Sequence, residues 1–127
     1  MSEPMTTENA PTLEELTRRL VAFRDARDWK QFHTLKNLLL SLALEAAEAL
    51  ELAQWKTDEE LEARLATDAT LKARLEEECA DVLLYLLLIA EKAGFDLAEA
   101  AARKIELNAR KYPVEKARGR ADKYHEL

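Results

Sequence analysis

The chain has 127 residues, the length of one domain, and its 48% hydrophobic and 35% charged residues are typical of a folded soluble protein rather than a disordered one. Two glycines and three prolines are too few for a loop-rich protein, so the composition favours helix almost throughout. A net charge of −6 without a broad basic patch excludes a binding site for a nucleic-acid polymer. The single cysteine, Cys79, excludes an intrachain disulfide and suits a reducing cytoplasm.

Both ends of the chain are polar. Residues 1–11 predict a flexible N-terminal tail without the basic and apolar regions of a signal peptide. The longest apolar run, residues 82–90, is far shorter than the ~20 residues that span a bilayer. We therefore expect a cytoplasmic protein that does not bind membranes, with one domain over residues 12–113 and a polar C-terminal tail over residues 114–127.

The sequence predicts an all-α bundle of four to five helices. Capping signals precede four of the five: Thr12 with Glu15, Thr34, Thr57 with Glu60, and Asp96 with Glu99. The remaining helix begins at about Thr70. In chain order, we expect the helices to end near Arg27, near Trp55, at about Ala66, at Ala93 and at Tyr112-Pro113. Gly94 stands where a glycine commonly ends a helix.

The apolar run of residues 82–90 also predicts assembly. Every residue in it is apolar or aromatic, so this helix has no polar face over two turns. Such a helix must be covered on all sides, which four or five helices of one chain can hardly do. We expect a homo-oligomer with this helix near a subunit contact; a central helix in a monomer is the alternative.

An acidic pair interrupts the apolar stripe of the second predicted helix. Glu45 stands where the helical period requires an apolar residue, and Glu48, one turn later, points the same way. The stripe itself consists of Leu38, Leu42, Ala49 and Leu52. Glu78 and Asp81 repeat the same spacing in a later helix. There Asp81 leads into the apolar run and shares a face with Leu84, Tyr85 and Leu88.

Four carboxylates on facing helices predict a metal site. Buried carboxylates need a partner because removing a charge from water costs several kcal/mol, and four of them together also repel one another. Mg²⁺ resolves both problems, because it takes oxygen ligands and leaves positions for water and substrate phosphates. The alternative is that each pair is only a solvated helix face, as Glu51, Glu76 and Glu77 are expected to be.

The pattern Glu45-x-x-Glu48, a gap of 29 residues and Glu78-x-x-Asp81 resembles the signature of the MazG-like all-α nucleotide pyrophosphohydrolases. The likeness extends over residues 12–127, and its other motifs are similar to the dCTP-hydrolysing members of that family. These motifs are Arg27-Asp28-Trp29-x-Gln31-Phe32-His33, Gln54-Trp55-Lys56, Asp81-Val82-Leu83-x-Tyr85-Leu86, Asn108-x-Arg110-x-Tyr112-Pro113, and Ala117-Arg118-Gly119 with Lys123-Tyr124-x-Glu126-Leu127.

The resemblance implies hydrolysis of a nucleoside triphosphate, dCTP or a modified dCTP first of all, to the monophosphate and pyrophosphate. It also implies a homodimer or homotetramer. Mg²⁺ would neutralise phosphate oxygens and activate a water, with Glu48 our choice for the base that takes the water's proton. The implied metal ligands are Glu45, Glu48, Glu78 and Asp81. The implied nucleotide contacts are Trp29, Lys30, Gln31, Phe32, His33, Trp55, Tyr85, Lys104 and Asn108.

Base preference is the open part of this hypothesis. Dedicated dCTP hydrolases resemble this chain but carry a histidine where Leu20 stands. His33 is then our candidate for reading the base. The alternatives are a hydrolase on the same scaffold with another or a broad base preference, and a non-enzymatic helical interaction module that keeps the acids. For Trp29 and Trp55, the alternative is that their side chains only pack in the hydrophobic core and do not contact the nucleotide.

Overall fold

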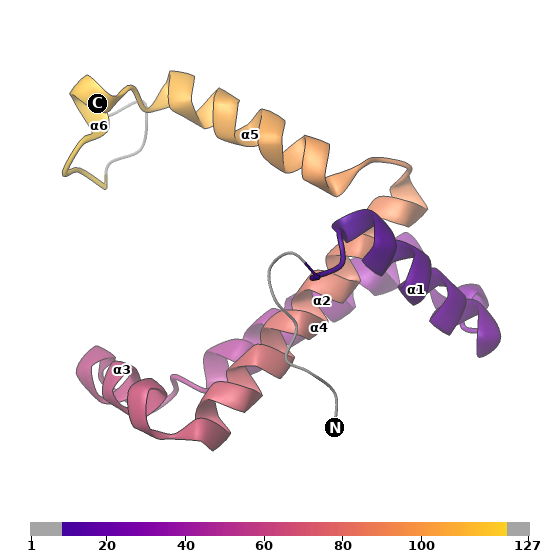
Figure 1. Cartoon of the computed structure of the whole chain (residues 1–127), viewed down its shortest axis with the longest axis horizontal. Coiled ribbons are helices and arrows are strands. Elements are labelled where there is room, and N and C mark those ends of the chain that lie inside the picture. The colour runs from indigo at the N-terminus through magenta and orange to yellow at the C-terminus, as the bar shows by residue number, and fades with distance from the viewer. Residues whose placement is uncertain (1–8, 122–127) are drawn as a thin grey trace. The chain divides into compact units, whose positions relative to one another are not determined.

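The structure, a computed structural model, describes residues 9–121, and these form six α-helices and one short 3₁₀ helix, with no β-strand in this range. The prediction of an all-α fold is confirmed. In chain order the elements are α1 (Leu13–Ala26), η1 (Lys30–Phe32), α2 (Leu35–Glu51), α3 (Asp58–Thr67), α4 (Ala69–Ala93), α5 (Leu97–Lys111) and α6 (Val114–Ala117) (Figure 1). No described helix is both long enough and apolar enough to cross a membrane.

The helices begin and end largely where the capping residues predict. Thr57 and Glu60 make the complete capping box of α3, and Asp96 accepts a hydrogen bond from the Glu99 amide at the start of α5. Gly94 ends α4 in the left-handed region, at φ 80°, which costs glycine little. The sequence did not predict the cap of α4: Asp68 accepts hydrogen bonds from the amides of the first turn.

Helix α2 is shorter than predicted, because it ends at Glu51 rather than near Trp55. The next three amides donate to carbonyls three residues earlier, as in a 3₁₀ turn. Trp55 then takes a φ of 67°, a left-handed conformation that bulky residues rarely adopt. The Lys56 ammonium donates to the Leu52 carbonyl at 3.0 Å, which satisfies an acceptor beyond the helix end.

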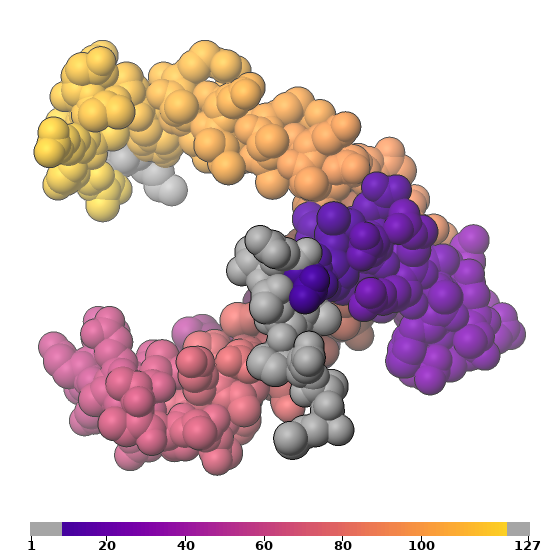
Figure 2. Space-filling model, in the orientation of Figure 1, coloured from indigo at the N-terminus to yellow at the C-terminus, as the bar shows by residue number. Residues whose placement is uncertain are grey.

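The chain divides into two compact units, Met1–Gly94 and Phe95–Leu127. In the first, α2 and α4 run side by side in opposite directions (Figure 1), and α1 packs against α4. Helix α3 packs against the N-terminal end of α4 (Figure 2). Leu38 of α2 meets Leu88 and Ile89 of α4 in a buried cluster, against which Leu20 and Tyr85 pack. This core holds α1, α2 and α4 together around the site described below.

One face of α2 is apolar and uncovered. Leu40, Leu44 and Leu50 lie opposite the inner stripe and are 60%, 58% and 71% exposed. By contrast, residues 82–86 of α4 are half-buried and residues 87–90 are buried within the chain itself. The extensive exposed apolar surface of this unit therefore lies on α2, rather than on the apolar run of α4.

The second unit consists of α5 and α6. Helix α5 ends at Lys111, just before Pro113, as predicted. Helix α6 forms four residues of the segment that we expected to be a polar tail. Residues 1–8 and 122–127, which belong to the two predicted tails, lie outside the described residues.

Candidate metal centre and nucleotide pocket

Three of the four predicted acids come together between α2 and α4. Glu45 of α2 and both Glu78 and Asp81 of α4 each place one carboxylate oxygen within 4.8 Å of the others. The two helices meet along their inner stripes, and Glu45 replaces an apolar residue in one stripe. Glu78 and Asp81 precede Tyr85 on the facing stripe, so the packing that buries the leucines also gathers the carboxylates.

The cluster is short of partners for its negative charge. Oε2 of Glu45 and Oε2 of Glu78 are buried without a hydrogen-bond partner. Loss of solvent, followed by the negative charge of Glu48, raises the pKa of Glu45. The same two causes raise the pKa of Glu78, and the opposing charge of Arg74 does not cancel them. Unpartnered hard oxygens with raised pKa values are what a divalent cation would satisfy, so the donor set fits Mg²⁺.

Glu48 lies at the edge of this cluster. It is exposed and is not one of the three residues whose oxygens converge. Its negative charge nevertheless contributes to the raised pKa of both Glu45 and Glu78. All four predicted acids are therefore neighbours, but Glu48 is the one whose carboxylate does not converge with the other three.

A cavity of about 320 Å³ adjoins the cluster at Asp81. This volume is at the lower end of the range of small-ligand pockets. Helix α1, the segment around η1, and α4 supply its lining: Leu20, Phe23, Arg24, Trp29, His33, Asp81, Leu84, Tyr85 and Leu88. Asp81 thus belongs both to the carboxylate cluster and to a pocket with aromatic walls, and it connects the two.

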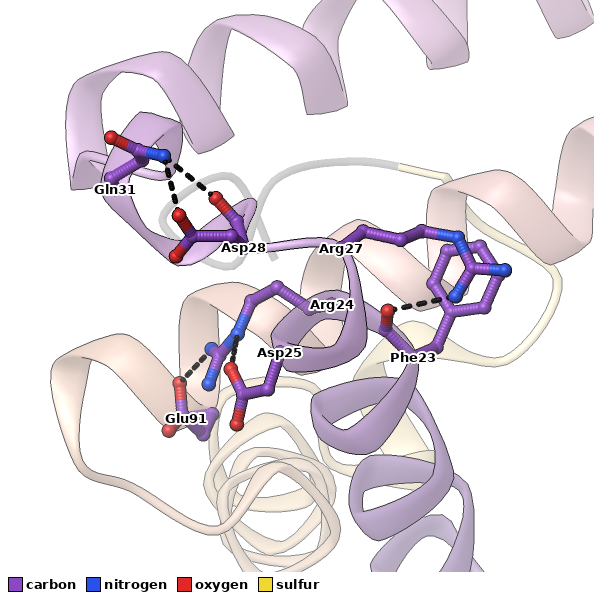
Figure 3. Close-up of polar contacts among 7 residues, drawn as sticks. All are labelled: Phe23, Arg24, Asp25, Arg27, Asp28, Gln31 and Glu91. Atoms are coloured by element: carbon purple, nitrogen blue, oxygen red, sulfur yellow. Dashed lines mark hydrogen bonds and ion pairs between the residues drawn. The ribbon is translucent and has the colours of Figure 1, made fainter.

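Trp29 is held at this pocket by a T-shaped aromatic contact. Its ring and that of Phe23 have centres 5.7 Å apart, with an angle of 75° between the planes. The Arg27 guanidinium lies 3.6 Å from the centre of the Phe23 ring and also donates to the Phe23 carbonyl (Figure 3). Because Trp29 is still 44% exposed, its side chain can stack on a ligand.

His33 offers the pocket a neutral polar group. Its Nδ1 atom is buried without a hydrogen-bond partner. Two causes lower the pKa of His33 below its ordinary value of 6.5. Burial is the larger, and the positive charge of Arg24 is the smaller. The imidazole is therefore neutral at pH 7, and one of its ring nitrogens can accept a hydrogen bond.

The other predicted nucleotide contacts lie outside this cavity. Lys30, Gln31 and Phe32 are exposed on η1, where the Gln31 amide donates to the carbonyl and the carboxylate of Asp28 (Figure 3). Trp55 is 91% exposed beyond the far end of α2. The 17 residues of α2 span about 25 Å, so Trp29 and Trp55 flank opposite ends of that helix.

Lys104 and Asn108 are exposed one turn apart on α5, in the second unit. Their side chains share a face of that helix, and the Asn108 carbonyl accepts a hydrogen bond from the Tyr112 amide at the helix end.

The sequence reasoning missed Arg24. It is 4% exposed, lines the cavity and pairs with carboxylates of α1 and α4. A signal was present: Arg24 lies four residues after Leu20, on the apolar stripe of the first helix, just as Glu45 lies on the stripe of the second. A charged residue at a core position indicates either a partner across the interface or a site.

Comparison with known proteins agrees with this geometry. Residues 40–127 match the MazG-like family. The chain is 43% identical to dCTP pyrophosphatase 1 of Bos taurus over 124 residues. This alignment covers 98% of this chain and 73% of that protein. For dCTP pyrophosphatase 1 of Homo sapiens the identity is 44% over 117 residues, 92% of this chain and 68% of that protein. A crystal structure of a pyrophosphatase from Archaeoglobus fulgidus aligns with a TM-score of 0.73 and 40% identity, over 89% of this chain and 99% of that one.

The carboxylate pairs, the all-α fold and these relatives lead to one conclusion: the chain belongs to the MazG-like family.

Proposed function

We propose that the protein is a Mg²⁺-dependent pyrophosphohydrolase that converts dCTP, and dCTP modified at the 5 position of the base, to the monophosphate and pyrophosphate. The observation that carries this proposal is the sharing of Asp81 between a three-carboxylate cluster and an aromatic pocket. The names of the relatives support the choice of dCTP. In the cell such an enzyme would clear these nucleotides from the cytoplasmic pool.

Glu45, Glu78 and Asp81 would hold the cation, with Glu48 as a fourth ligand at the edge. When bound, the cation supplies positive charge against the oxygens of the triphosphate. Glu48 is our candidate for the base that takes a proton from the attacking water, because its carboxylate stands outside the three converging oxygens. Hydrolysis then breaks the bond between the α-phosphorus and the oxygen that bridges it to the β-phosphorus.

The pocket next to Asp81 would hold the cytosine. Trp29 and Tyr85 provide aromatic surface, and Leu20 contributes no hydrogen-bonding group. The neutral imidazole of His33 is the group that would accept a hydrogen bond from the 4-amino group of cytosine, which thymine lacks. An apolar wall formed in part by Leu84 would tolerate a substituent at the 5 position of the ring.

A screen of the common and 5-modified triphosphates for pyrophosphate release tests the function. With Mg²⁺ we expect release from dCTP and 5-methyl-dCTP, and none in EDTA or with the Asp81→Asn variant. Equal rates with dTTP or purine triphosphates would indicate the alternative hydrolase with a broad base preference. No release from any triphosphate by the folded protein would favour an interaction module.

Metal binding is expected to stabilise the fold in a pH-dependent way. The folded state raises the pKa of Glu45 and Glu78 above their ordinary value of 4.5, so the folded protein binds protons more tightly than the unfolded one. In EDTA, the stability from these two groups is therefore present below about pH 4.5 and is lost as pH rises through their raised pKa values. Mg²⁺ at a hundredfold excess over its Kd should add about 2.7 kcal/mol where the carboxyls are ionised.

Thermal melts with Mg²⁺ and with EDTA, from pH 4.5 to pH 8, measure this effect. The difference in Tm should be small at the acidic end and should widen as pH rises. Identical midpoints at pH 8 at a saturating Mg²⁺ concentration would count against a shared metal site.

The exposed face of α2 is our candidate for the contact in a homodimer or homotetramer. Leu40, Leu44 and Leu50 form an apolar surface that a second copy would cover. Trp55 lies beyond the end of α2 and does not line the pocket of its own chain. It would therefore contact a nucleotide that is bound in the pocket of a second copy. Lys104 and Asn108 stay candidates for contacts with the nucleotide.

Light scattering should therefore give a multiple of the 14.5 kDa chain mass at micromolar concentration. Leu44→Glu should lower the mass to that of one chain while the helical content stays, because Leu44 is 58% exposed within the chain. Arg19→Glu, which adds an acid at an exposed position of α1, away from this face, is the control. A monomeric wild-type protein would exclude this assembly.

A further inference from the structure

Among the described residues of the chain, Arg24 stands out as a charged residue that is buried. Its Nε donates to the carboxylate of Asp25 at 2.9 Å, and its Nη1 donates to the carboxylate of Glu91 at 3.0 Å. Asp25 is its own neighbour on α1, whereas Glu91 comes from the last turn of α4. In Figure 3 the guanidinium lies between these two carboxylates. The side chain thus ties the C-terminal end of α1 to α4.

The backbone of the same residue holds the turn that carries Trp29. The Arg24 carbonyl accepts hydrogen bonds from the amides of Arg27, at 3.2 Å, and Trp29, at 3.1 Å. Between them Asp28 takes a left-handed φ of 53°, a conformation that aspartate tolerates better than most residues. Gln31 donates to the Asp28 carbonyl and carboxylate, both at 3.0 Å, and keeps this turn closed.

Arg24 also faces the pocket itself. Its side chain lines the cavity together with Trp29 and His33. Its positive charge is one of the two causes that lower the pKa of His33. Arg24 therefore connects α4, the tryptophan turn and the imidazole, although it is not one of the carboxylates of the metal centre.

We propose that Arg24 is a positioning residue that holds Trp29 and His33 in the geometry needed to bind the base, and that Glu91 acts on the pocket through Arg24. Without Glu91, the buried guanidinium keeps only Asp25, its partner on the same helix, and loses its ion pair with α4. Its Nη1 group is then buried without a carboxylate, which is unfavourable, so the side chain moves towards water. The end of α1 then shifts, and the carbonyl that holds the Trp29 amide shifts with it. The effect on substrate binding rests on the proposed function, but the effect on Trp29 does not.

Two readouts test the proposal, one of them independent of activity. The chain has two tryptophans, so Trp55→Phe leaves Trp29 as the sole tryptophan, whose emission can be excited selectively over that of the tyrosines. In that background, Arg24→Gln and Glu91→Ala should each raise the acrylamide quenching constant of Trp29 at least about twofold. In the otherwise native enzyme, the same substitutions should raise KM for dCTP at least about tenfold while kcat stays within about threefold, as expected when a stacking contact is lost. The double variant should be no worse than Arg24→Gln alone.

Glu14→Gln is the matched control, because Glu14 makes an ion pair of the same 3.0 Å length with Arg18 on an exposed face of α1. It should change neither readout. If Arg24→Gln does not fold, Glu91→Ala decides, since that side chain is 31% exposed and its loss is milder. Unchanged quenching and KM in a folded variant would overturn the proposal. So would additive effects of the two substitutions, or a fall in kcat that merely follows the loss of stability. If the wild-type protein failed to release pyrophosphate, the proposed function would be lost, while the quenching experiment would still decide the role of Arg24.

Discussion

Replacement of Asp81 by Asn should lower kcat/KM for dCTP by at least about a thousandfold, since a metal contributes several kcal/mol and each 1.36 kcal/mol is tenfold in rate. Asp81 is the carboxylate that belongs to both the cluster and the pocket, so its loss should weaken cation binding next to the pocket. Glu45→Gln should have a similar effect, because Glu45 is the contribution of α2 to the three converging oxygens. Steady-state kinetics at saturating Mg²⁺, with circular dichroism to confirm the helical content, measure both.

The matched controls are Glu51→Gln on α2 and Glu76→Gln on α4, which remove exposed acids from the same helices. They should keep near-normal activity. In EDTA at pH 8, Glu45→Gln should also raise the Tm above that of the wild type, because it removes a desolvated charge that the neighbouring carboxylates repel. A Glu45→Gln enzyme with normal activity would show that Glu45 is not a ligand.

Replacement of Trp29 by Ala should raise KM for dCTP about 10- to 100-fold, because stacking on a base is worth about 1–3 kcal/mol. We expect kcat to change little, because Trp29 contacts Phe23 and lines the pocket but is not one of the carboxylates of the metal centre. Kinetics on a variant first shown to be folded separate this role from core packing. Arg19→Ala, an exposed substitution on α1, is the control. A folded Trp29→Ala enzyme with unchanged KM would remove Trp29 from the base site.

The same assay distinguishes the other candidates for base recognition. His33→Ala should reduce the preference for dCTP over dTTP more than it slows the hydrolysis of dCTP, because we expect the imidazole to contact the base rather than the phosphates. Trp55→Ala should raise KM only if a second copy brings Trp55 to the pocket. An oligomeric Trp55→Ala enzyme with unchanged KM and unchanged base preference would place Trp55 outside the site.

Local pattern was sufficient to predict the helices, most of their caps and the two acidic pairs. Caps such as Thr57 with Glu60 depend on residues three apart, and a helical period places Glu45 on the buried stripe wherever the helix packs. The family followed from the same pairs, and the comparisons confirmed it. The end of α2 was misplaced, because the left-handed turn at Trp55 has no strong local signal such as a glycine.

Only the tertiary structure decided which side chains meet. The spacing on each helix is the same for the two acidic pairs, yet three of the four carboxylates converge and Glu48 stays outside, because convergence depends on how α2 and α4 cross. Packing also brings Trp29 and Asp81 to the lining of one cavity that does not include Trp55, although both tryptophans flank the same helix in the sequence. The buried Arg24 pairs with Glu91, 67 residues away, a distance in sequence at which no helical period carries information.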